Sequence, residues 1–219
     1  TALEIPHANP QIVYVGDDPG LMESRKDFAN AVYLFEEREP LQAGDTDNTD
    51  KVQRKLQEDH DDVADQRLVL RARFLDFVIG DWDRHEDNWR WLPEKTKDGK
   101  IYHPIPRDRD KVFYKTSGVF PWILSHQWLK SNLQPFGEEI RDIKGWNYNA
   151  RVFDRYFLNS LNEQDWREEI DIVQQRLTPD LLRQALNQMP PEINALSGEE
   201  LLRVMKSRIS DLQQTALDY

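Results

Sequence analysis

The spacing of apolar residues divides the chain into regions of different expected structure. Near the N-terminus, Ile12–Val15 and Ala31–Phe35 are short runs of β-branched and aromatic residues that predict two strands. From Lys51 to about Phe77 the apolar residues recur at helical spacing, which predicts a helix that Gly80 ends. The polar stretch between Gln42 and Asp50 predicts a loop.

A second strand pair and a series of helices are expected further along. Trp89–Leu92 and Ile101–Ile105 flank a turn that contains Asp98 and Gly99, and this arrangement predicts a β-hairpin with positive backbone angles at the turn. The pattern then predicts helices at Pro121–Lys130, Ala150–Leu161, Glu163–Arg176, Pro179–Met189 and Gly198–Leu217, with Thr178 and Ser197 as start signals. The expected fold class is therefore α+β and mostly helical, with a small β-hairpin.

Composition narrows the possible functions. The 219 residues fit one domain of ordinary size, and the net charge of -11 excludes nucleic-acid binding driven by overall charge. Because cysteine is absent, disulfides, thiolate metal sites and cysteine nucleophiles are excluded. No window approaches 18 apolar residues, so no transmembrane segment is predicted. The chain starts at Thr1 without Met, and we expect it to be a piece of a longer protein.

Candidate chemistry lies in two polar segments beside the predicted hairpin. Residues 80–89 (GDWDRHEDNW) separate the most apolar helix from the first hairpin strand, and residues 106–110 (PRDRD) follow the second strand. Loops at the same end of one hairpin can converge, and Asp and Asn oxygens are suitable ligands for Mg²⁺ together with phosphate oxygens and water. A polar loop that merely caps a core helix is the alternative for the first segment alone.

The first segment resembles the catalytic loop of atypical kinases. Residues 83–89 (DRHEDNW) are similar to the D-R-x-x-D-N-W loop of type II phosphatidylinositol 4-kinases, and HipA-type and CotH-type kinases have related loops. Asp83 and Asn88 have the separation of the catalytic Asp and metal-binding Asn of protein kinases. Residues 108–113 (DRDKVF) resemble the metal-binding Asp segment of these families, and residues 32–38 (VYLFEER) resemble the hinge strand between the kinase lobes.

This resemblance implies a kinase-like C-lobe at residues 41–219, preceded by partial N-lobe strands and the hinge at residues 1–40. It implies ATP- and Mg²⁺-dependent phosphoryl transfer to a hydroxyl acceptor, which could be a protein, a lipid headgroup or a small molecule. The implied site residues are catalytic Asp83 and Arg84, metal-binding Asn88, Asp108 and Asp110, and nucleotide-binding Phe35, Glu36 and Glu37. For Arg84, a phosphate contact and a structural partner for a loop carboxylate are equally open. The resemblance extends to bacterial envelope-associated proteins, which favours a periplasmic or cell-envelope setting.

Other expectations concern single residues near the site. His85 is expected to pack or to hydrogen-bond rather than to catalyse, and Trp89 and Trp91 are expected in the core. The acceptor is expected to face residues 106–120, where Lys111 and Lys115 either contact an anionic substrate or balance an acidic surface.

Two other function classes are open. The segment before the expected hinge has no glycine-rich phosphate loop, and Lys26 is its only lysine, in a polar setting. A catalytically inactive pseudokinase or scaffold module is therefore the alternative. Residues 80–84 (GDWDR) also resemble the G-D-x-x-D-R loop of calcineurin-like metallophosphoesterases, but the chain lacks their G-N-H motif and histidine spacing.

Overall fold

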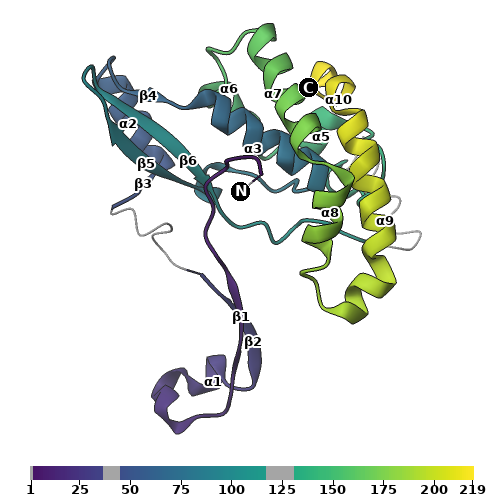
Figure 1. Cartoon of the computed structure of the whole chain (residues 1–219). Coiled ribbons are helices and arrows are strands. Elements are labelled where there is room, and N and C mark those ends of the chain that lie inside the picture. The colour runs from purple at the N-terminus through teal and green to yellow at the C-terminus, as the bar shows by residue number, and fades with distance from the viewer. Residues whose placement is uncertain (1, 37–44, 117–130) are drawn as a thin grey trace.

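The computed structural model describes residues 2–36, 45–116 and 131–219, and its architecture is α+β (Figure 1). A mostly helical body carries a four-stranded sheet, and a narrow arm made of residues 10–36 extends away from it (Figure 1). Within these described ranges, no helix is long and apolar enough to cross a membrane.

The arm is a two-stranded antiparallel ribbon with helical turns at its tip. Strands β1 (Gln11–Val15) and β2 (Ala31–Phe35) pair along their whole length, which confirms both predicted strands. The tip contains the 3-10 helix η1 (Pro19–Ser24) and the short helix α1 (Arg25–Phe28). One ribbon face is apolar and largely exposed, since Ile12 is 75% exposed and Leu34, its partner across the ribbon, is 62% exposed.

The sheet of the body has the strand order β3-β5-β6-β4. The antiparallel hairpin of β5 (Trp89–Lys95) and β6 (Lys100–Pro106) confirms the predicted hairpin. Its turn differs from the prediction, because Gly99 has a positive φ whereas Asp98 does not. A side chain at Gly99 would also collide with the backbone oxygen of Asp61, 2.2 Å from the Cβ position.

The helical region predicted at Lys51–Phe77 is interrupted. Helix α2 (Thr49–Glu58) ends before the short strand β4 (Val63–Ala64), which pairs in parallel with β6, and helix α3 (Gln66–Ile79) follows. The single predicted helix was wrong because the polar residues 59–62 (DHDD) have no apolar face to bury, and Asp62 instead accepts hydrogen bonds from Lys100 and Tyr102. The loop predicted up to Asp50 was wrong in part, since β3 (Asp47–Asn48) pairs with β5.

The C-terminal half forms a helical layer against α3 (Figure 1). Helix α7 (Glu163–Arg176) has the predicted bounds, and α8 (Pro179–Leu186) begins after Thr178 as predicted. The predicted start at Ser197 was wrong, because α9 (Pro191–Ser210) begins earlier and a separate α10 (Leu212–Asp218) follows it. The remaining elements are η4 (Ser131–Leu133), α5 (Ile143–Trp146) and α6 (Arg151–Phe157). The helix predicted at 121–130 lies outside the described residues.

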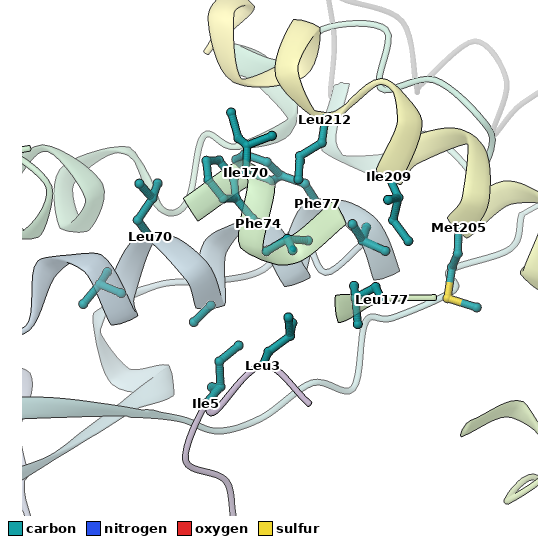
Figure 2. Packing of buried hydrophobic residues seen from close by; sticks show 14 of the residues in the cluster. Leu3, Ile5, Leu70, Phe74, Phe77, Ile170, Leu177, Met205, Ile209 and Leu212 are labelled. Atoms are coloured by element: carbon teal, nitrogen blue, oxygen red, sulfur yellow. The ribbon is translucent and has the colours of Figure 1, made fainter. Parts of the chain in front are cut away.

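The core is built around α3. Figure 2 shows Phe74 and Phe77 of α3 beside Ile170 of α7 and Leu212 of α10, and the N-terminal Leu3 and Ile5 belong to the same buried cluster. A second group of rings joins the sheet to α6: Trp89 stacks on Phe153 with centroids 4.6 Å apart, and Trp91 stacks on Phe157 at 4.5 Å. Both tryptophans are buried, which confirms their predicted place in the core.

Candidate functional site

The loop of interest begins where α3 ends. Gly80 has a left-handed φ of 77°, and its N–H bonds to the carbonyl of Asp76 at 2.8 Å. Any side chain at this position would also meet the ring of Phe136, 2.6 Å from the Cβ position. Glycine is therefore required both for the backbone turn and for the close packing, and the chain turns sharply into residues 81–88.

A buried carboxylate on α3 holds this loop and the second polar segment together. Asp76 has no exposed surface and accepts hydrogen bonds from Arg73 at 2.6 Å, from Arg84 at 3.0 Å and from Arg109 at 3.2 Å. Burial opposes its charge, but the attraction of Arg84, Arg109 and Arg73 outweighs burial and lowers the pKa of Asp76. One charged group thus anchors Arg84 of the first loop and Arg109 of the second.

Arg84 is fully buried and its donors are occupied. Its guanidinium bonds to Asp76, to Asp81 at 2.5 Å and to the backbone carbonyl of Arg107, and it lies over the ring of Trp89. These contacts favour the second of the two roles considered for Arg84, that of a structural partner for loop carboxylates. Its catalytic role stays a prediction that no contact of the described structure supports.

Asp81 differs electrostatically from Asp76. It is 1% exposed, and its Oδ1 has no hydrogen-bond partner among the described residues. Burial and the neighbouring charge of Asp76 raise the pKa of Asp81 to about 6, against the opposing attraction of Arg84.

The predicted metal ligands Asn88 and Asp108 lie together. Asn88 donates from Nδ2 to Asp108 Oδ2 at 3.3 Å, and its Oδ1 accepts from the backbone N–H of His85 at 2.9 Å. The hairpin brings them together, since Trp89 pairs with Pro106 and the N–H of the next residue, Arg107, bonds to the carbonyl of Asn88 at 2.8 Å. This confirms the predicted convergence of the two loops at Asn88 and Asp108.

His85 has the structural role that the sequence predicts. Its ring Nδ1 accepts from the N–H of Asp87 at 3.3 Å, while Asn88 bonds back to the His85 backbone, so the two side chains cap the 3-10 helix η3 (Glu86–Asn88) reciprocally. This cap fixes the orientation of Asn88 just before β5 begins.

Asp108 has an unusual backbone conformation. Its φ is 52°, a left-handed conformation that aspartate tolerates better than most residues but that still costs free energy. Strain of this kind is retained where the surrounding structure holds a side chain in place, and it is frequent at functional sites. Asp108 is nevertheless exposed, so its carboxylate is accessible.

Asp83 and Asp110 complete the acidic group. Asp83 accepts a hydrogen bond from Asn149 at 2.6 Å, a residue that sequence reasoning missed because it lies 66 positions away. Lys111 contacts Asp110, and this bond, with weaker contributions from Asp83 and Asp108, raises the pKa of the Lys111 ammonium. Lys111 is therefore attracted electrostatically to all three carboxylates, Asp83, Asp108 and Asp110.

The donor set fits only part of a metal shell. Within residues 2–36, 45–116 and 131–219, no three His, Cys, Asp or Glu side chains are arranged to hold a metal ion. Asn88 and Asp108 together provide an amide oxygen and a carboxylate, which suits Mg²⁺, because this ion usually keeps several waters and takes phosphate oxygens as further ligands.

A hollow of about 490 Å³ lies between this segment and the base of the arm. Its charged lining consists of four carboxylates and two arginines: Glu36, Asp87, Asp108, Asp110, Arg107 and Arg109. Glu36 accepts a hydrogen bond from Arg107 at 2.8 Å, so the expected hinge contacts the second polar segment, one residue before the expected metal-binding segment.

The three predicted nucleotide-binding residues have different positions. Glu36 lines the hollow, whereas Phe35 is 61% exposed and is not part of the lining, and Glu37 lies outside the described residues. Leu34 lines the hollow instead, and strand alternation could have identified it, because Leu34 in β2 is two residues before Glu36 and alternate residues of an extended chain point to the same side.

Comparisons with known proteins give no match: no family model, no curated protein and no solved structure is similar to this chain. Its function has to be inferred from the site itself.

Proposed function

We propose that this chain is the kinase-like C-lobe, with part of the N-lobe, of an atypical kinase that transfers a phosphoryl group from ATP to a hydroxyl acceptor. The observation that carries the proposal is the bond between Asn88 and Asp108, at the edge of a hollow that Glu36 of the expected hinge also lines. Glu36, Asn88 and Asp108, three of the residues that would bind nucleotide and Mg²⁺, therefore come from separate segments and lie at this hollow.

Each group has a chemical role in this proposal. Asn88 and Asp108 would hold Mg²⁺, which would neutralise phosphate charge when bound, with Asp110 as a supporting ligand. Asp83, oriented by Asn149, would orient the acceptor hydroxyl and take its proton. The acceptor oxygen would attack the γ-phosphorus, the bond to the bridging β–γ oxygen would break, and ADP would leave. Protein, lipid-headgroup and small-molecule acceptors all satisfy this chemistry.

A nucleotide-binding pseudokinase is the second candidate, and one observation favours it. No lysine lines the hollow within the described structure, and Lys26 lies in α1 at the tip of the arm, away from the body (Figure 1). A kinase uses a lysine to position the nucleotide phosphates, so a chain without one in reach would bind nucleotide with little or no turnover.

Calorimetric titration with ATP, in Mg²⁺ and in EDTA, tests the nucleotide site. We expect binding that requires Mg²⁺ and weakens at least tenfold in Asp108→Asn, a change that keeps the backbone preference of the position. Asp98→Asn, in the exposed hairpin turn, is the matched control and should bind as the unmodified chain does. Equal binding in EDTA, or in Asp108→Asn, contradicts the proposal.

Release of ADP then separates the two candidates. A kinase should form ADP in the presence of Mg²⁺ faster than its Asp83→Asn variant, although that variant still binds ATP. Metal-dependent binding with the same background ADP formation in both proteins would establish the pseudokinase.

A further inference from the structure

A second hollow lies among α5, α6, α7 and α10. Its volume of about 680 Å³ is in the range typical of small-molecule sites. None of the residues that line it belongs to the candidate kinase site, so it requires a separate explanation.

One wall of this hollow is apolar and rigid. Trp166 and Tyr219 both line it, and their ring centroids are 6.1 Å apart. Trp166 also packs edge-on against Phe74 at 5.6 Å, and Tyr219 packs edge-on against Phe77 at 5.7 Å. Because both rings are held against the core, they present a preformed surface to an apolar group.

The carboxylate at the floor of the hollow is already neutralised. Asp154 is buried and accepts from Arg73 at 3.0 Å, from Asn147 at 2.9 Å and from the hydroxyl of Tyr219 at 2.5 Å. With a buried cation and two neutral donors as partners, Asp154 has little capacity left to balance the charges at the rim.

Three cations line the hollow: Lys144, Arg151 and Arg155. None of them forms an ion pair within the described part of the chain, where most other arginines do; Arg151 instead lies over the ring of Tyr148. The excess of positive charge contrasts with the net charge of -11 and with the acidic lining of the candidate kinase site.

The arrangement of two of these cations is unfavourable for the helix that carries them. Arg151 and Arg155 are four residues apart on α6, so their side chains are neighbours on one face and repel each other. Arg151 is also in the first helical turn, where the helix dipole disfavours a cation. Local costs of this kind are expected where binding rather than folding determines the residue.

We propose that this hollow binds an amphipathic anion, with a phosphate or carboxylate group held between Arg151 and Arg155 and an aromatic or alkyl body against Trp166. Two arginines suit such a head group because each guanidinium offers several donors in a fixed plane. The ligand is either a free small molecule or an anionic lipid head group. This inference does not depend on the proposed kinase function.

Titration with phenyl phosphate tests the proposal. Binding is measured by calorimetry and by the NMR signal of the Trp166 indole N–H, which is assigned from its absence in the Trp166→Phe spectrum. We expect saturable binding with a Kd of about 1 mM or tighter, with a shift of that signal. Inorganic phosphate alone and phenol alone should each bind at least tenfold more weakly. Absence of saturable binding by phenyl phosphate and by hexyl phosphate overturns the proposal.

The variant Arg151→Gln/Arg155→Gln locates the binding. It should weaken phenyl phosphate binding at least tenfold, whereas Arg167→Gln/Arg183→Gln, which removes two exposed arginines on α7 and α8, should have no effect. Removal of the repelling pair should not lower the Tm, so a loss of binding would not come from unfolding. Unchanged binding in the Arg151→Gln/Arg155→Gln protein contradicts the proposed site.

Vesicles distinguish the two sources of the ligand. Binding to phosphatidylglycerol vesicles but not to phosphatidylcholine vesicles, and only with Arg151 and Arg155 present, would identify a lipid head group. Phenyl phosphate binding without vesicle binding would identify a soluble ligand.

Discussion

Two groups of carboxylates near the candidate site differ in burial and in the number of their partners, although Arg109, which bonds to the first group, lies between the two members of the second. In the first group, Asp76 is fully buried, and each of its bonds goes to an arginine from a different part of the chain. In the second group, Asp108 and Asp110 are exposed and have few partners. A buried charge is costly without partners, so the first group serves architecture, whereas the second remains available to a ligand. The carboxylates of this region are therefore not equivalent.

The strongest test of this difference is removal of the buried carboxylate. Asp76→Ala removes the carboxylate that Arg73, Arg84 and Arg109 share and leaves these guanidinium groups with an excess of positive charge, and we expect a loss of about 3–5 kcal/mol in the free energy of unfolding. Urea denaturation measures this loss. Asp110→Ala is the control and should change the free energy by less than about 0.5 kcal/mol, as is usual for surface positions. A loss below about 1 kcal/mol in Asp76→Ala would remove the architectural role.

The pH dependence of the free energy of unfolding should reveal the raised pKa of Asp81. Its folded pKa of about 6 is above the value of 3.8 for an unperturbed carboxyl, so between these values the folded state holds more protons than the unfolded state. Stability from this group is complete below about pH 4 and is lost as the pH rises to about 6, a loss on the order of 3 kcal/mol. Denaturation at pH 4, 5, 6 and 7 should show this decline, and Asp81→Asn should abolish it. The same decline in Asp81→Asn would assign it to another group.

Asp83 is intermediate between the two groups, because it is partly buried and has one amide partner. Asn149→Ala removes the hydrogen bond to Asp83, and we expect a loss of about 1 kcal/mol in the free energy of unfolding. Asn187→Ala, which removes a hydrogen bond between exposed side chains, should cost less. Equal losses would mean that the Asp83 contact is no stronger than a surface contact.

The smallest expected effect concerns the backbone of Asp108. Because its φ is 52°, Asp108→Gly should be tolerated or slightly stabilising, while Asp108→Ala should cost about 1 kcal/mol relative to glycine. Thermal unfolding of the two variants measures the difference. If alanine proved as stable as glycine, the left-handed conformation would not be imposed by the surrounding structure.

The sequence predicted those parts of the site that depend on local order along the chain. The convergence of Asn88 and Asp108 followed from a hairpin whose two strands and turn are recognisable, because pairing brings its ends together. The end of α3 at Gly80 followed from the same kind of local signal. The polar residues 59–62, none of which is apolar, were a signal for the break between α2 and α3 that the prediction missed.

Tertiary partners could not be predicted in this way. Asp76 lies inside the most apolar predicted helix, where a single acidic residue is normally interpreted as facing solvent. Nothing near it in the sequence indicates that Arg109 is its partner. The choice between the two roles of Arg84 likewise depended on Asp76, eight residues away, and on backbone carbonyls of another loop. At Ser197, the start signal lies inside α9, because the helix already begins at Pro191, a residue favoured in the first helical turn.

The arrangement of three cations around Asp76 has a genetic consequence. Loss of one arginine leaves the carboxylate with two partners. Loss of the carboxylate leaves three arginines with only two buried counter-charges, Asp154 beside Arg73 and Asp81 beside Arg84. Suppressors of an Asp76→Ala defect should therefore arise at Arg109, whose ion pair in the described structure is with Asp76, through replacement by an uncharged side chain of similar length such as methionine. The stability lost with the Asp76 carboxylate would thus be partly restored by removing a neighbouring positive charge.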